Sequence, residues 1–313
     1  MLKNNPNSEI KKKFFDRNII ITKNYYDQHI LEKKSWFGDV PPFSNLEINI
    51  TDLCNRKCSF CPKSNRKLFP NRKKFLTESF YQKILEELSF LHFKGRISFC
   101  GLSEPLMHNN LNSLITLTKK YCPDCFLDIL TNGDFLTVSN AKIFFKSGLD
   151  NIKISMYDGP HQISLFNEIK AKLLLTDEQF IIRKRYLSSN KNFGLTINNR
   201  GGSVNLQEYG ITPLKEPLKR SCYYPFHKLI IDHNGDVMIC PCDWQKKLIV
   251  GNLNKKSLLE IWNSELLTKV RKRLIEKDRT FPPCQECDVN GTLYAQLHFQ
   301  AWRLYYGEIN NYD

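Results

Sequence analysis

The sequence lacks the features of membrane and secreted proteins. No apolar run approaches the roughly 18 residues that a membrane-spanning helix needs. The first residues, Met1 to Asn7, do not contain the apolar stretch of a signal peptide. We therefore expect a cytoplasmic protein that does not bind a membrane.

Cysteine, by contrast, is abundant, with 11 among the 313 residues. Disulfides are rare in cytoplasmic proteins, so this number favours metal binding over a disulfide framework. The net charge of +14 would suit an anionic partner. Lysine and arginine are spread along the chain, however, which favours an ordinary solvated surface over a nucleic-acid interface.

Three of the cysteines, Cys54, Cys58 and Cys61, lie within eight residues. Three thiolates can hold three irons of a [4Fe–4S] cluster, which normally takes four cysteines, and so leave one iron open. Alternation over residues 45–50 predicts a strand just upstream, and α/β folds place their chemistry on loops that follow strands. A zinc knuckle is the alternative, but such sites pair two C-x2-C halves or add histidines, and no histidine lies nearby.

After the first strand, apolar patterns of strand and helix alternate. Such alternation predicts an α/β fold with parallel strands and right-handed crossovers. Six units are too few for a closed eight-stranded barrel. We expect strands at 45–50, 96–100, 126–130, 151–156, 180–186 and 194–198, and helices at 77–91, 111–121, 138–146 and 163–175.

The spacing C-x3-C-x2-C, with Phe60 just before the third cysteine, resembles the radical S-adenosylmethionine (SAM) enzymes. The resemblance implies a partial (β/α)6 barrel that is open on one side. It also implies that the open iron binds SAM and that the reduced cluster cleaves SAM to a 5′-deoxyadenosyl radical. The electron would come from flavodoxin or ferredoxin, which are usually acidic and would suit the positive net charge.

The resemblance also suggests which residues contact SAM. The segment from Gly101 to Pro105 resembles the family's Gly-Gly-Glu-Pro motif, although Leu102 and Ser103 replace the two glycines. A plain Asn-Gly turn at 132–133 and a satisfied strand hydroxyl at Ser155 are the structural alternatives. The expected SAM contacts are Phe60, Gly101, Ser103, Glu104, Asn132, Ser155 and Arg183, and the expected substrate contacts are Asn198 and Arg200.

A second cysteine set follows residue 203, where the strand–helix alternation stops. Apolar runs at 226–232 and 236–240 flank Asn234-Gly235 and predict a hairpin, and Ser257 opens a predicted helix at 257–276. The segment 222–287 resembles the SPASM/twitch auxiliary-cluster domain. That resemblance implies a second [4Fe–4S] cluster, with tetrahedral zinc as the alternative. The ligands would be Cys222, Cys240, Cys284 and Cys287.

The other cysteines have no assigned cluster. Cys242 either packs beside the second cluster or acts catalytically, as a hydrogen-atom donor to a substrate radical. Cys100 is expected to be core, and the C-x2-C pair Cys122 and Cys125 is expected to be structural.

These interpretations give three expected parts: an N-terminal extension over 1–44 that packs on the barrel, a radical SAM partial barrel over 45–203, and a SPASM/twitch domain with a C-terminal tail over 204–313. A second cluster saturated by cysteine would accept an electron, as in enzymes of the 2-deoxy-scyllo-inosamine dehydrogenase type. We therefore expect a radical SAM oxidoreductase, a dehydrogenase or epimerase, acting on a small sugar or cyclitol. The alternatives are a SPASM-type peptide or protein maturase and an RNA-modifying or RNA-binding iron–sulfur protein, although no RNA-binding module is recognisable.

Overall fold

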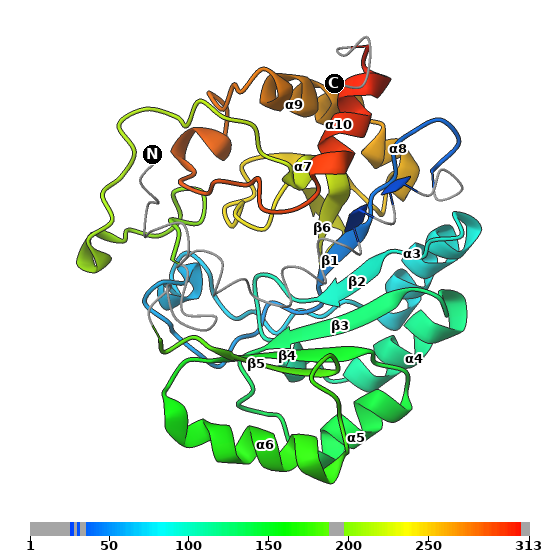
Figure 1. The fold of residues 1–313 in the computed structure, drawn as a ribbon, viewed down its shortest axis with the longest axis vertical. Coiled ribbons are helices and arrows are strands. Elements are labelled where there is room, and N and C mark those ends of the chain that lie inside the picture. The colour runs from blue at the N-terminus through cyan, green and yellow to red at the C-terminus, as the bar shows by residue number, and fades with distance from the viewer. Residues whose placement is uncertain (1–25, 28–29, 32–35, 188–196, 308–313) are drawn as a thin grey trace, which may run out of the picture.

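The computed structural model describes residues 26–27, 30–31, 36–187 and 197–307, and one eight-stranded sheet organises them (Figure 1). Along the sheet the strand order is β5-β4-β3-β2-β1-β6-β7-β8. The strands are β1 (Asn45–Asn49), β2 (Arg96–Phe99), β3 (Phe126–Thr131), β4 (Asn151–Met156), β5 (Phe180–Lys184), β6 (Lys228–Asp232), β7 (Asp236–Met238) and β8 (Ile249–Asn252).

The strands β1 to β5 are parallel and are joined by helices that lie together on one side of the sheet, as Figure 1 shows. This arrangement confirms the predicted α/β fold. The first crossover helix begins at its predicted N-cap, Thr77, because the Thr77 side chain accepts a hydrogen bond from the Phe80 amide. The helices are α3 (Glu78–Phe90), α4 (Leu111–Tyr121), α5 (Val138–Lys146) and α6 (Ile163–Lys172).

The predicted sixth strand, 194–198, falls mostly on residues outside the described ranges, and 197–198 are not in a strand. A sixth parallel strand is instead β6, which pairs with the free edge of β1 in the register Asn45↔Lys228 to Asn49↔Asp232. The hairpin β6–β7 and the strand β8 then continue the sheet with antiparallel pairing. The segment that carries the second cysteine set is therefore built onto the sheet that carries the first.

The hairpin confirms the prediction around Asn234-Gly235, where Gly235 adopts a φ of 88°. Its first strand begins only at Lys228, because α7 (Tyr224–His227) forms a helical turn before it. The single helix predicted at 257–276 is wrong. Two helices, α8 (Leu258–Trp262) and α9 (Glu265–Ile275), occupy this segment, because the Ser264 side chain caps a new helix by accepting from the Leu267 amide.

The final helix, α10 (Gln296–Tyr305), packs its Trp302 ring 5.6 Å from the Trp262 ring of α8. The Arg271 guanidinium lies over both rings, at 4.0 and 3.7 Å. Within the N-terminal extension, the described Tyr26 and Ile30 are buried, as expected for a segment that packs on the body of the protein. No helix in the described ranges has the length and apolar character that crossing a membrane requires.

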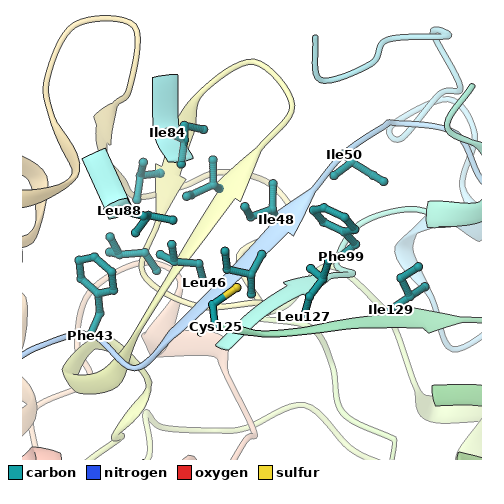
Figure 2. Close-up of a cluster of buried hydrophobic side chains, with 14 of the residues drawn as sticks. Phe43, Leu46, Ile48, Ile50, Ile84, Leu88, Phe99, Cys125, Leu127 and Ile129 are labelled. Atoms are coloured by element: carbon teal, nitrogen blue, oxygen red, sulfur yellow. The ribbon is translucent and has the colours of Figure 1, made fainter. Parts of the chain in front are cut away.

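The sheet's helix-covered face is the main apolar core (Figure 2). Leu46 and Ile48 of β1 pack there with Ile84 and Leu88 of α3. Cys125 lies in the same cluster. Its partner in the C-x2-C pair, Cys122, is also buried and contacts the Leu85 carbonyl oxygen through its thiol. Both cysteines are therefore core residues, as predicted.

The strand residues that alternate with this core are polar and yet buried. Asp128 of β3 forms ion pairs with Arg96 of β2 and Lys153 of β4, and its side chain is 2% exposed. Lys228 of β6 pairs with Glu47 of β1. Because strand side chains alternate between faces, these charges lie on the face opposite the helices. Buried charges are tolerated when they are paired. Glu47 of this layer also lines the cavity described next.

Candidate metal centres

A cavity of about 260 Å³ lies at the C-terminal ends of the parallel strands, and the cysteine triad lines it. Cys54, Cys58 and Cys61 come from the loop after β1. Six of the seven residues expected to contact SAM lie on the same walls, and so does the expected substrate contact Arg200. The six are Phe60, Gly101, Ser103, Glu104, Asn132 and Ser155.

The triad loop is held by polar contacts from the segment that follows it. The Asn71 side chain donates to the Cys54 carbonyl oxygen at 2.9 Å and accepts from the Cys54 amide at 3.3 Å. The Arg66 guanidinium donates to the carbonyl oxygens of Cys54 and Arg56, both at 2.7 Å. These bonds fix the backbone from which the thiols project.

Arg56 fastens the triad loop to the ends of two other strands. Its guanidinium donates to the carboxylate of Asp134, after β3, and to that of Asp158, after β4, with contacts of 2.7 Å to each. The sequence interpretation did not identify this bridge. A signal was present, because Asp134 and Asp158 each follow closely after a predicted strand, where parallel strands bring their ends to one edge.

Glu104 connects two segments of the cavity wall through hydrogen bonds. One carboxylate oxygen accepts from the Thr131 hydroxyl at 2.6 Å and from the Leu106 amide at 3.0 Å, and the other accepts from the Asn132 amide at 2.8 Å. Burial raises the pKa of this carboxyl, while these donors act in the opposite direction. Glu104 therefore ties the end of β2 to the end of β3, and its role toward SAM stays a prediction.

Two other expected contacts lie outside the cavity lining. Arg183, on β5, is opposite Ser155 in the β4–β5 register, and its Nε is buried with no hydrogen-bond partner among the described residues. Asn198 does not line the cavity but accepts a hydrogen bond from the Arg200 amide at 3.1 Å. It supports the loop that carries Arg200.

The cavity also includes residues that the sequence interpretation missed. Glu47 lies on its wall together with the aromatic residues Tyr157 and Trp244. The Tyr157 ring is 5.3 Å from the Phe60 ring. The sequence gives an indication for Glu47, because a glutamate within a buried strand implies either a buried ion-pair partner or a functional site. Trp244 comes from the second cysteine segment, and the local sequence pattern could not place it at this cavity.

The triad fits a cluster with one open position. All three cysteines are free thiols, partly exposed to a cavity large enough to admit a further ligand. Burial raises the pKa of Cys58 to about 11, so the bare thiol is neutral and a metal must displace its proton.

The second cysteine set surrounds a smaller cavity, of about 20 Å³, which shares none of its lining residues with the first. The four expected ligands, Cys222, Cys240, Cys284 and Cys287, all line it, and none forms a disulfide. Cys242 lines it as well, so the structure gathers five thiols in one place.

Arg279 forms the frame of this second site. The residue is 2% exposed, and its guanidinium donates to four carbonyl oxygens, at 2.7 to 2.9 Å. Two of them, Arg220 and Ser221, precede Cys222, and the other two, Val289 and Asn290, follow Cys287. One buried cation therefore closes the loop that brings the first and last cysteines of the set together.

At both sites the thiols line a cavity, an arrangement that a [4Fe–4S] cluster can occupy. Tetrahedral zinc would need its thiolates at about 2.3 Å from one centre. In a [4Fe–4S] cluster each thiolate binds a different iron, so thiols arranged around a cavity are suitable.

Comparisons with known proteins agree with both assignments. Residues 48–168 match the Radical SAM superfamily, and residues 222–288 match SPASM, an iron-sulfur cluster-binding domain. The chain is 29% identical over 247 residues to S-adenosyl-L-methionine-dependent 2-deoxy-scyllo-inosamine dehydrogenase from Niallia circulans, covering 79% of this chain and 93% of that protein. It is 28% identical over 116 residues to a probable GTP 3′,8-cyclase from Thermococcus kodakarensis, covering 37% of this chain and 36% of the cyclase.

Solved structures give the same result. The crystal structure of BtrN in complex with AdoMet and 2-DOIA superposes with a TM-score of 0.65 at 27% identity, covering 79% of this chain and 94% of BtrN. BtrN in an open conformation gives a TM-score of 0.58 at 24% identity, which supports the fold. The predicted resemblance is therefore confirmed: the chain belongs to the radical SAM superfamily and carries a SPASM iron–sulfur cluster-binding domain after its radical SAM domain.

Proposed function

We propose that this protein is a radical SAM dehydrogenase that oxidises a secondary alcohol of a cyclitol to a ketone. One observation carries the proposal: the chain is similar to an inosamine dehydrogenase over nearly that enzyme's whole length, and both cysteine sets lie at separate cavities of one sheet. The full-length similarity favours this function over peptide maturation and RNA modification.

Two [4Fe–4S] clusters and SAM would supply the radical chemistry: a 5′-deoxyadenosyl radical that removes a hydrogen atom from the carbinol carbon, and an acceptor for the electron left behind. The overall change is balanced, because the substrate loses one hydrogen atom, one hydroxyl proton and one electron. The chain's residues must bind, orient and shield the reactants.

The cavity walls suit a small polyhydroxylated substrate. Arg200 supplies a planar group with several hydrogen-bond donors, and its Nε is buried with no hydrogen-bond partner among the described residues. The Glu47 carboxylate, on the same cavity lining, supplies hydrogen-bond acceptors. The rings of Phe60, Tyr157 and Trp244 would exclude water from the reacting atoms. We propose Arg200 as a substrate-binding residue, with Asn198 supporting it.

The test is isotope transfer. Reconstituted, reduced protein is incubated with SAM and 2-deoxy-scyllo-inosamine carrying deuterium on its carbinol carbons. We expect deuterium in the 5′-deoxyadenosine and one ketone formed per SAM consumed, measured by mass spectrometry. An Arg200→Gln variant should still cleave SAM slowly but lose most of the ketone.

The proposal fails if SAM is cleaved at a normal rate while no cyclitol or sugar alcohol transfers deuterium. Label transferred from a peptide instead would indicate a maturase. Salt-sensitive retention of RNA, with no oxidation of the cyclitol, would indicate the RNA-modifying function.

We also propose that the electron donor is an acidic cytoplasmic carrier protein that docks beside the triad loop. Residues 53–75 contain eight lysines and arginines and no aspartate or glutamate. Lys57, Lys67, Arg72, Lys73 and Lys74 are exposed. The same segment holds the triad through Arg66 and Asn71, so a partner bound there would lie close to Cys54.

Charge reversal tests this surface. The triple variant Lys67→Glu, Lys73→Glu and Lys74→Glu should slow reduction by flavodoxin by at least about tenfold at low salt, because steering by opposite charges accelerates association. Its activity with dithionite should not change. The matched control, Lys120→Glu, Lys142→Glu and Lys146→Glu on α4 and α5, makes the same change in net charge elsewhere. Equal slowing in both triples, or no salt dependence, would contradict the proposed surface.

A further inference from the structure

Arg200, the residue proposed to bind the substrate, lies in a turn whose backbone is strained. Its φ is 49°, and Gly201 and Gly202 follow it with φ of 60° and 83°. All three residues are in the left-handed region, which glycine adopts readily and residues with a side chain adopt rarely. A residue such as Arg200 keeps this conformation only where its surroundings impose it. The contacts that hold the turn therefore determine where Arg200 lies.

Asn199 joins this turn to the segment of the second cysteine set that contains Cys287. The Asn199 amide donates to both carboxylate oxygens of Asp288, each at 3.0 Å. Its side-chain Nδ2 donates to the Glu286 carbonyl oxygen at 2.5 Å. Its Oδ1 accepts from the Asp288 amide at 3.4 Å and from the Gly202 amide at 3.3 Å. Asn199 is therefore bonded to the residues on either side of Cys287 and to the far end of its own turn.

Two further contacts hold the turn against the segment that follows β7. The Cys242 thiol donates to the Asn198 side-chain oxygen at 3.8 Å, and the same oxygen accepts from the Arg200 amide. A Cβ at Gly201 would lie 2.9 Å from the Cys242 carbonyl oxygen, so the close approach of the two segments requires glycine there. The strained turn is thus imposed by the second cysteine segment, which is distant in the sequence.

We propose that Asn199 is a positioning residue, which holds the strained turn so that Arg200 lies at the cavity of the cysteine triad. Arg200 lines that cavity and Asn199 does not, so Asn199 acts through Arg200. The inference rests on the proposed function in one respect, namely that Arg200 binds the substrate. Without the Asn199 side chain the turn can relax, and the affinity for the substrate then falls in proportion to the fraction of molecules that keep Arg200 in place.

Three variants of the full, reconstituted chain test the proposal. Asn199→Ala removes the side-chain bonds. Asn199→Asp keeps the size of the side chain but replaces the donor facing the Glu286 carbonyl by an oxygen. Asn205→Ala is the control, because the Asn205 side chain accepts from the Gln207 amide at 3.0 Å, next to the strained turn but outside it. The measurements are iron content, hydrogen–deuterium exchange of peptides covering 197–206, and KM and kcat for 2-deoxy-scyllo-inosamine.

We expect about eight irons per chain in all variants. Exchange in 197–206 should become about tenfold faster in both Asn199 variants, because local opening becomes easier when side-chain hydrogen bonds to the backbone are lost. KM should also rise about tenfold, with a much smaller change in kcat, because the defect is in substrate binding. Asn205→Ala should match the wild type in iron content, exchange and kinetics.

Unchanged exchange in Asn199→Ala would overturn the proposal, because the side chain would then not hold the turn. Wild-type behaviour of Asn199→Asp would overturn it too, since only the size of the side chain would matter. Faster exchange with an unchanged KM would show that Arg200 needs no positioning, and loss of iron would place the defect at the metal site. The exchange measurement needs no substrate. A wild type that forms no ketone would therefore contradict the proposed function, while exchange would still decide whether Asn199 holds the turn.

Discussion

Replacing Cys54, Cys58 and Cys61 together by alanine should lower the iron content from about eight to about four atoms per chain. It should also abolish cleavage of SAM. The reason is that these thiols are the triad facing the larger cavity, whereas the second set lies at a separate cavity built on Arg279. Iron quantitation and anaerobic assay of 5′-deoxyadenosine measure the two effects.

A double replacement, Cys122→Ala and Cys125→Ala, is the control for loss of buried thiols. Both residues lie in the apolar core, so their removal should leave eight irons and SAM cleavage in place, provided that the protein folds. Complete loss of iron from the triad variant would contradict two independent sites. Zinc in place of the remaining iron would remove the electron-acceptor role of the second site.

The fold could be predicted from the sequence because its local signals agree with one another. Five parallel strands, their crossover helices and the β6–β7 hairpin all lie within a few residues of their predicted bounds. The errors arose where tertiary contacts, and not local sequence, determine the strand pairing or the end of a helix. Nothing in the local pattern of 228–232 indicates that this strand would pair in parallel with β1, more than 180 residues away. The break between α8 and α9 had a local signal, since Ser264 is a good N-cap, but the amphipathic pattern that continues across it concealed the break.

The cysteine ligands of the candidate sites could be predicted from motifs in the sequence. Contacts between loops that are distant in the sequence could not. The triad and the second cysteine set follow from spacing. The bridge from Arg56 to Asp134 and Asp158, and the contacts of Cys242 with Asn198, depend on loops that are distant in sequence. The Gly-Gly-Glu-Pro resemblance led to Glu104, which lines the triad cavity and whose carboxylate accepts hydrogen bonds from backbone amides of the cavity wall. Its contact with SAM stays a prediction.

The buried ion pairs of Asp128 should make a large contribution to stability. Asp128 is 2% exposed between Arg96 and Lys153, and an Asp128→Asn variant would leave two buried cations without their counter-charge. Breaking a buried pair in this way costs about 3–5 kcal/mol of unfolding free energy. The midpoint of urea unfolding, followed by circular dichroism on the cluster-loaded protein, should fall accordingly. Asp177→Asn, whose ion pair with Lys170 is on the surface and whose carboxylate is 75% exposed, should cost less than about 1 kcal/mol.

The pH dependence distinguishes this electrostatic cause from a simple packing defect. Burial acts to raise the pKa of Asp128, but Arg96 and Lys153 outweigh it and hold the pKa well below its usual range. A carboxyl with a depressed folded-state pKa stabilises the protein at pH values above its unfolded pKa, which is about 3.9, and this stabilisation declines as the pH falls toward the folded pKa. The difference between wild type and Asp128→Asn should therefore not shrink between pH 8 and pH 5. Burial lowers the pKa of Lys153 to about 7, and loss of Asp128 lowers it further, so the difference should widen below pH 7, where only the wild type protonates Lys153 in the folded state. A difference that already shrinks between pH 7 and pH 6 would mean that the pKa of Asp128 is not depressed, and the ion pairs would not be the reason for the loss of stability.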